Sequence, residues 1–171
     1  MYDSLKILFT EQEIGARVAE LAGQIDRDYA GKELHLTCIL KGGAFFLCEL
    51  AKRITIPVTL DFMSVSSYGE GMSSSGIVRL AKDLDEPLEG KHVLIVEDII
   101  DSGKTLRYLI SVLYARKPTD IRLCTLLSKP CRREVDIPVD YIGFEIPDVF
   151  VVGYGLDHAQ KHRNLPYIAT V

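Results

Sequence analysis

The side chains best suited to chemistry lie together in one short segment, residues 97–105. Glu97, Asp98 and Asp101 are carboxylates, and the run Ser102 to Thr105 follows them directly. Carboxylates suit sugar hydroxyls or a divalent cation, which prefers oxygen ligands. A Ser-Gly-Lys-Thr turn at the start of a helix offers backbone N–H groups and hydroxyls to a phosphate. The segment therefore predicts a site for a phosphorylated sugar.

The Gly-Lys-Thr ending also matches the end of a loop that binds nucleoside triphosphates. Such a loop needs a glycine five residues before Gly103, and this chain has Asp98 there. The neighbouring carboxylates would also repel a triphosphate. An acidic pocket of the receiver type would use the carboxylates but would not need the phosphate turn. A phosphate monoester is the better match to the whole segment.

Alternating strands and helices are expected to position this segment. Thr10 and Glu13 form a capping box, and apolar residues then recur at helical spacing, which predicts a helix over 11–28. Continuous apolar runs predict buried strands. We expect strands at 34–40, 58–65, 92–96 and 121–127, a helical pattern that runs through Phe45 to Ala51 and stops by Pro57, and a helix at 103–115. A polar loop is expected at 66–76, and short strands at 141–145, 150–152 and 167–169.

This order predicts an α/β fold with an open, mostly parallel twisted sheet and helices on both faces. The carboxyl ends of parallel strands meet at one edge of such a sheet, where ligands bind, and the three acids fall at such an end. The short strands after Pro130 are expected to form a small hood with the other terminal segment. We expect residues 1–171 to form a single domain.

Composition narrows the possible functions. The 171 residues are 47% hydrophobic and 26% charged, which is typical of one globular domain. The net charge of −4 gives no basic footprint for nucleic acid. No apolar run is long enough to span a membrane, and no signal or transit peptide is recognised, so we expect a cytoplasmic protein. The four cysteines form no CxxC pair and are expected to be free thiols.

Residues 93–106 closely resemble the phosphoribosyl-pyrophosphate signature of type I phosphoribosyltransferases. The run Leu40-Lys41-Gly42-Gly43 resembles the pyrophosphate loop of that family, and Ser67-Tyr68-Gly69 resembles the start of its flexible catalytic loop. The phrase GFEIPDVFVVGYGLD at 143–157 resembles the hypoxanthine-guanine branch. The matching motifs span about residues 40–163, with Lys129, Phe150-Val151, Asp157 and Arg163 in the order expected of that branch.

The resemblance implies a role for each matching residue. Glu97 and Asp98 would hold the ribose hydroxyls directly or through Mg²⁺, Asp157 would bind a second Mg²⁺, and Asp101 would be the base that faces purine N7. A cis peptide is usual before the lysine of the pyrophosphate loop. The implied substrate-binding set is Lys41, Gly42 and Arg163 for pyrophosphate, Ser67 and Tyr68 in the catalytic loop, Glu97 and Asp98 for ribose, Asp101, Ser102, Gly103, Lys104 and Thr105 for the 5′-phosphate, and Ile99, Phe150, Lys129 and Val151 for the purine, with Asp157 beside them.

The implied activity is purine salvage. A magnesium-dependent homodimer or homotetramer would move the phosphoribosyl group of 5-phosphoribosyl 1-pyrophosphate (PRPP) to hypoxanthine or guanine, giving IMP or GMP and pyrophosphate. One alternative is a PRPP-sensing regulator that binds nucleic acid, although this chain has no basic face or extra DNA-binding domain. Another is a transferase of the same fold that acts on xanthine or a pyrimidine. Whether Arg132 or Arg133 contacts pyrophosphate stays open.

Overall fold

A six-stranded sheet is the middle layer of the fold. The computed structural model describes residues 5–67 and 78–171. The strands of this sheet are β2 (Leu34–Leu40), β3 (Val58–Ser67), β4 (Val78–Lys82), β5 (His92–Ile100), β6 (Asp120–Ser128) and β7 (Tyr141–Glu145). Their order is β4-β3-β2-β5-β6-β7, and every pair is parallel except β3 with β4. The expected open, mostly parallel sheet is confirmed.

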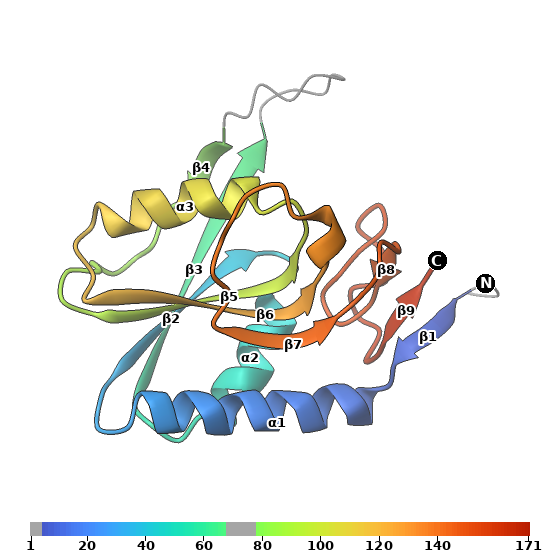
Figure 1. Cartoon of the computed structure of the whole chain (residues 1–171), viewed down its shortest axis with the longest axis horizontal. Coiled ribbons are helices and arrows are strands. Elements are labelled where there is room, and N and C mark those ends of the chain that lie inside the picture. Colours follow the sequence, from blue (N-terminus) through green and yellow to red (C-terminus); the bar gives the residue numbers. More distant parts are fainter. Residues whose placement is uncertain (1–4, 68–77) are drawn as a thin grey trace.

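Helices cover both faces of the sheet (Figure 1). They are α1 (Glu11–Asp28), α2 (Ala44–Ala51) and α3 (Lys104–Tyr114), with α1 and α2 on one face and α3 on the other. The capping box of α1 is present, since Glu13 Oε2 accepts from the Thr10 backbone N–H at 2.8 Å and Thr10 Oγ1 accepts from the Glu13 N–H at 3.3 Å. No helix within the described residues is long and apolar enough to cross a membrane.

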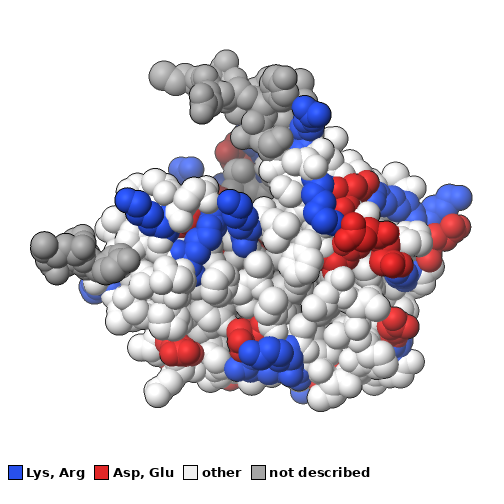
Figure 2. Space-filling model, turned by 180° about the vertical axis from the view of Figure 1, so that it is seen from behind, with Lys and Arg blue, Asp and Glu red and all other residues white. Residues whose placement is uncertain are grey.

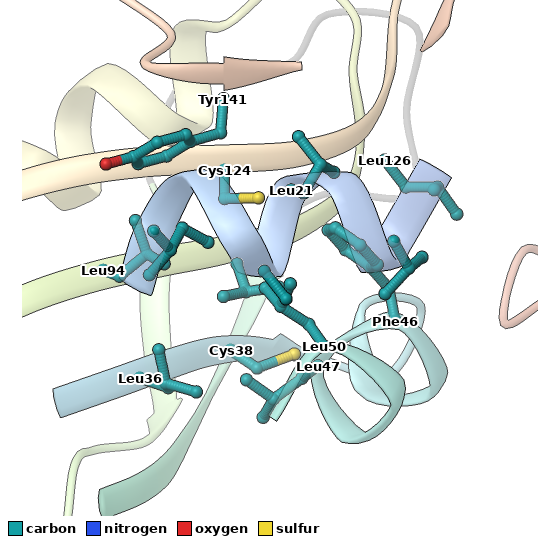
Figure 3. Close-up of a cluster of buried hydrophobic side chains, with 14 of the residues drawn as sticks. Leu21, Leu36, Cys38, Phe46, Leu47, Leu50, Leu94, Cys124, Leu126 and Tyr141 are labelled. Atoms are coloured by element: carbon teal, nitrogen blue, oxygen red, sulfur yellow. The ribbon is translucent and has the colours of Figure 1, made fainter. Parts of the chain in front are cut away.

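Central strand β5 shows why its sequence is a continuous apolar run. Val93 and Ile95 pack in the cluster that contains Leu109 of α3. Leu94 and Val96 pack in the opposite cluster with α1 and α2, part of which Figure 3 shows. All four strand side chains are fully buried. Because helices cover both faces of the sheet at β5, the side chains on both faces are apolar. The strand therefore lacks the alternation of apolar and polar residues that a half-exposed strand shows.

A three-stranded antiparallel sheet forms the hood. It consists of β1 (Lys6–Phe9), β8 (Val151–Val152) and β9 (Ile168–Thr170) in the order β1-β9-β8. Figure 1 shows β1 and β9 side by side, although they come from opposite ends of the described chain. The sequence predicts the two C-terminal strands but not β1. The expected strand at 141–145 is present as β7, and it joins the edge of the main sheet rather than the hood.

Some observed boundaries differ from the expected ones. β5 continues four residues past Val96, because Glu97 and Ile99 keep their pairing with Thr125 and Leu127 of β6. The expected ending of the strand at the acids is therefore wrong, and Glu97 lies inside β5. Helix α3 begins one residue later than expected, at Lys104. Residues 66–67 belong to β3, and the remainder of the expected polar loop, including Tyr68, lies outside the described residues.

Candidate active site

The candidate active site lies where β2, β5 and β6 end at their carboxyl sides. Two neighbouring cavities of about 270 and 320 Å³ share Ile99 and Asp101 in their walls. We call the first the phosphate cavity and the second the base cavity. The phosphate cavity is lined by Ile39, Glu97, Ile99, Ile100, Asp101, Ser102, Gly103, Thr105 and Leu106. The base cavity is lined by Asp98, Ile99, Asp101, Lys129, Phe150, Val151, Leu156 and Asp157.

The turn beneath the phosphate cavity depends on a glycine. Gly103 is the N-cap of α3 with φ of 83°, a conformation that favours glycine. A Cβ there would also lie 3.0 Å from Ile137 Cδ1. The first N–H groups of a helix lack partners within the helix, so the start of α3 offers donors to an anion. The side chain of Lys104 pairs with Glu134 and is not part of the cavity wall, so only its backbone serves the turn.

The predicted pyrophosphate loop packs tightly against the end of β5. A Cβ at Gly42 would lie 1.7 Å from Asp98 Oδ2, so no side chain fits there. On the other side, a Cβ at Gly155, whose φ is 101°, would lie 2.1 Å from the carbonyl oxygen of Gly42. The peptide between Leu40 and Lys41 is cis, as the family resemblance implies. Backbone contact therefore fixes this loop beside the acids.

Two cations lie next to this loop. Arg163 Nη1 donates to the carbonyl of Gly155 at 2.6 Å, and its Nη2 lies 2.7 Å from Asp157 Oδ1. Lys41 Nζ donates to Gln160 Oε1 at 3.4 Å, while the Gln160 N–H donates to Asp157 Oδ2 at 2.7 Å. Arg163 Nε is buried and has no hydrogen-bond partner among the residues that the structure describes. The group suits an anion, and it includes Gln160, which no sequence motif indicated.

Lys129 directs its side chain into the base cavity from the end of β6. Its backbone N–H donates to the carbonyl of Ile100 at 3.0 Å, which ties it to the end of β5. Its side chain is 10% exposed, and its ammonium lies 3.6 Å from Asp148 Oδ1. Phe150, 56% exposed, and buried Val151 of β8 belong to the wall. The apolar residues of this cavity, together with the nearly buried Lys129, suit a flat ring that carries a hydrogen-bond acceptor, and Asp98, Asp101 and Asp157 line the rest of the wall.

The structure separates the two arginines that the sequence leaves unassigned. Arg132, in the single-turn 3-10 helix Pro130–Arg132, donates from Nε to Asp101 Oδ1 at 3.1 Å. Arg133 instead donates from Nη2 to Ser128 Oγ at 2.9 Å. Arg132 thus contacts the residue expected to be catalytic. The direction of an exposed side chain after a turn leaves no pattern in the sequence, so this contact could not be foreseen.

Known proteins resemble this sequence over most of its length. Residues 4–159 match the phosphoribosyl transferase domain family. The hypoxanthine phosphoribosyltransferase of Salmonella typhimurium is 50% identical over all of this chain and 97% of its own length. The hypoxanthine-guanine phosphoribosyltransferase of Streptococcus thermophilus is 46% identical over 99% of this chain and 94% of its own length. The chain belongs to the hypoxanthine-guanine phosphoribosyltransferase family.

Solved structures of this phosphoribosyltransferase family have the same fold. A hypoxanthine phosphoribosyltransferase from Staphylococcus aureus matches with a TM-score of 0.96 and 47% identity, covering 100% of this chain and 94% of that one. A hypoxanthine-guanine phosphoribosyltransferase from Bacillus anthracis matches with a TM-score of 0.93 and 48% identity, covering 97% and 98%. The expected family and fold are confirmed, and the chain is a transferase rather than a regulator.

The structure gathers most of the residues that the phosphoribosyltransferase motifs indicate. Most of them line the two cavities, and Asp101 lines both. Lys41 and Arg163 lie beside the base cavity, where they contact Gln160 and Asp157. Ser67 is the last residue of β3, and its side chain and Tyr68 lie outside the described residues. The expected metal ligands do not form one cluster: within the described ranges, no three His, Cys, Asp or Glu residues are grouped to hold an ion.

Two carboxyl groups of this phosphoribosyltransferase site, those of Glu97 and Asp98, have raised pKa values, so each is costly to ionise. Burial raises the pKa of Glu97 well above its usual range, and the neighbouring charge of Asp98 raises it further. Burial also raises the pKa of Asp98, and Asp157 adds to this effect, while the N–H of Ile99 and the charge of Arg163 partly offset it. Hydrogen-bond donors or a cation would relieve this cost.

Proposed function

We propose that this protein transfers the phosphoribosyl group of PRPP to N9 of hypoxanthine or guanine, releasing pyrophosphate and giving IMP or GMP. The observation that carries the proposal is that a phosphate-binding turn and a base cavity meet at Ile99 and Asp101. A ribose that bridges them would lie along the end of β5, which carries Glu97 and Asp98. The relatives named above support the two bases.

The chemistry requires charge to be stabilised on both sides of the sugar. The bond from C1 to a pyrophosphate oxygen breaks, and a bond from C1 to N9 forms. Lys41 and Arg163 would bind the leaving pyrophosphate, whose negative charge increases as the bond breaks. Asp101 would accept the proton that the purine loses, either directly at N7 or after its relocation. These roles use the two cavities and the cations beside them.

The choice of base follows from Lys129. A lysine ammonium is a donor only, so it suits O6 of hypoxanthine or guanine. Adenine has an amino group at that position and offers no equal acceptor there. The nearly buried ammonium keeps its ion pair with Asp148 but loses the acceptor that O6 would provide, and a donor left unsatisfied in a buried site costs about 1 to 3 kcal/mol. We therefore propose that adenine is a poor substrate.

Magnesium is the proposed cofactor: Glu97 and Asp98 would hold the ribose hydroxyls directly or through one Mg²⁺, and Asp157 would bind a second Mg²⁺ directly or through water. The donor set fits, since carboxylate oxygens suit Mg²⁺ and the charge of Asp157 raises the pKa of Asp98, which a cation would offset. Mg²⁺ usually takes one or two carboxylates and completes its shell with substrate phosphates and water, so a cluster of three acids is not required. When bound, it supplies positive charge to the leaving pyrophosphate.

We also propose a cytoplasmic homodimer or homotetramer that binds no nucleic acid. The four cysteines are free, as in most cytosolic proteins. On the face in Figure 2, uncharged surface separates the basic groups and acidic groups lie beside several of them. A continuous basic stripe would be expected of a nucleic-acid binder. For an oligomer, the half-exposed ring of Phe45 offers apolar surface to a second copy.

Product formation tests the proposal. The purified protein is mixed with hypoxanthine, PRPP and Mg²⁺, and IMP and pyrophosphate are measured by chromatography and a coupled assay. We expect the two products in equal amounts and no reaction after chelation of the metal. Absence of IMP would overturn the function, whereas full activity in chelator would overturn only the cofactor.

A further inference from the structure

Four charged side chains form an alternating row along the base cavity. Asp101 Oδ1 accepts from Arg132 Nε at 3.1 Å, and Arg132 Nη1 lies 3.7 Å from Asp148 Oδ2. The other oxygen of Asp148, Oδ1, lies 3.6 Å from Lys129 Nζ. The two ends of the row, Asp101 and Lys129, are the groups that the proposed function assigns to N7 and O6 of the purine. The two middle residues, Arg132 and Asp148, line neither cavity.

Each middle residue restricts the end group beside it. Arg132 occupies Oδ1 of Asp101, and Oδ2 accepts no hydrogen bond from any residue within the described ranges. One oxygen of Asp101 is thus left for the base. At the other end, the nearly buried Lys129 needs a counter-charge, and Asp148 is its one ion-pair partner in the described part of the chain.

Stability does not account for this row. The side chains of Asp101, Arg132 and Asp148 are each about half exposed. Ion pairs between exposed side chains contribute little to folding stability. The residues also come from three separate segments: the turn after β5, the 3-10 helix after β6 and the loop before β8. A row that joins three segments and ends at both base-contacting groups fits a role in geometry better than a role in folding.

We propose that Arg132 and Asp148 are positioning residues, which hold Asp101 and Lys129 in the orientation that contacts the purine. Arg132 would fix Asp101 with Oδ2 toward the base, and Asp148 would hold the Lys129 ammonium against the O6 position. The inference rests on the proposed function and adds two residues to it. It predicts that each positioning residue acts only through its own partner, which double-mutant cycles measure directly.

The first cycle pairs Arg132→Met with Asp101→Asn, using single-turnover IMP formation as the readout. Misplacing a catalytic group by about 1 Å can cost 10²-fold. We expect Arg132→Met to lower the rate of transfer by about 10- to 100-fold with KM changed less than about twofold. In the Asp101→Asn background the same change should cost less than about twofold. Arg132→Gln, which retains an N–H donor, should recover part of the rate.

The second cycle pairs Asp148→Asn with Lys129→Ala, using KM for hypoxanthine as the readout. We expect Asp148→Asn to raise KM by about tenfold in the wild-type background, since the loss falls on binding of the base. In the Lys129→Ala background it should have almost no effect, and Asp148→Glu should restore part of the affinity. Arg116→Met is the matched control, because it breaks a surface ion pair with Asp83 at 2.8 Å outside both cavities and should leave kcat and KM unchanged.

The outcomes of these experiments distinguish a failure of the positioning role from a failure of the proposed function. Equal losses in both backgrounds, or no loss in the single variants, would overturn the positioning role. A fall in thermal midpoint that accounts for the fall in rate would mean that the row is structural and would also overturn it. A wild-type protein that makes no IMP would instead overturn the proposed function, and this inference with it.

Discussion

At the scale of single residues, the site depends on the placement of Asp101 and Lys129 by the strands and on their orientation by side chains from other segments. Asp101 and Lys129 follow the ends of neighbouring strands, so the sequence predicts that they meet at one edge of the sheet. The contacts that orient them could not be predicted, because Arg132 and Asp148 reach them as exposed side chains from separate segments. Gln160 was missed for the same reason. The positions of strands along the chain are encoded in local patterns, whereas such side-chain contacts depend on tertiary packing.

Asp101→Asn tests the proposed proton acceptor. The amide keeps the shape of the carboxylate but cannot take a proton, so we expect kcat to fall by about 10²- to 10⁴-fold while KM for both substrates changes little. Steady-state kinetics at neutral pH would measure both constants. Turnover at the wild-type rate would remove Asp101 from the chemistry.

Glu97→Gln, measured in magnesium-free buffer, tests the cost of holding the partly buried acid Glu97 in the folded protein. The folded protein holds the proton of Glu97 at higher pH than the unfolded chain, whose pKa is near 4.5. The folded state therefore binds more protons above that pH, and the free energy of unfolding falls as pH rises through the raised folded pKa. The variant should have the higher thermal midpoint at alkaline pH and lose this advantage below about pH 4.5. Equal thermal midpoints of the wild type and the Glu97→Gln variant at all pH values would contradict the raised pKa of Glu97.

At the scale of elements, sequence patterns predicted the helices, most strands of the main sheet and two strands of the hood, and they missed β1 and β4. Helix α1 begins and ends where its capping box and periodicity indicate. β1 was missed because four residues are too few for a pattern and its partner β9 lies at the other end of the chain. β5 exceeds its predicted length because pairing with β6 continues under the acids. Strand ends set by a distant partner cannot be predicted from the strand alone.

Gly42→Ala tests the contact between the pyrophosphate loop and β5. The new Cβ would overlap Asp98 Oδ2, so the loop or the acid must move. We expect KM for PRPP to rise by about 10- to 100-fold. Gly23→Ala in α1 is the control, because its Cβ meets nothing closer than the Arg27 side chain at 3.6 Å. An unchanged KM for PRPP in the Gly42 variant would show that the loop does not position the pyrophosphate.

Thr10→Ala tests whether the cap of α1 serves folding alone. Its hydroxyl accepts from the N–H of Glu13, and its own N–H donates to the Glu13 carboxylate. Loss of a cap side chain costs about 0.5 to 2 kcal/mol. Denaturant unfolding should show this loss, with kcat and KM unchanged at temperatures where the protein is folded. A change in KM for either substrate would mean that the cap also affects the site.

At the scale of the whole molecule, the fold brings distant segments to one edge of the sheet. The acids and the phosphate turn come from the middle of the chain, while Arg163 comes from the segment between β8 and β9. β8 supplies Val151 to the base cavity and is held by β9, which pairs in turn with β1. Both ends of the chain thus support the wall that is expected to contact the purine.

The central claim is that this edge of the sheet transfers phosphoribosyl groups to 6-oxopurines. The most direct measurement is kcat/KM of the wild-type protein with PRPP and each of hypoxanthine, guanine, xanthine and adenine. We expect hypoxanthine and guanine to lead, xanthine to rank below guanine, and adenine to be lower by one to two decades or more, the ratio that about 1 to 3 kcal/mol gives. Efficient adenine turnover, or no nucleotide from any of the four bases, would contradict the account.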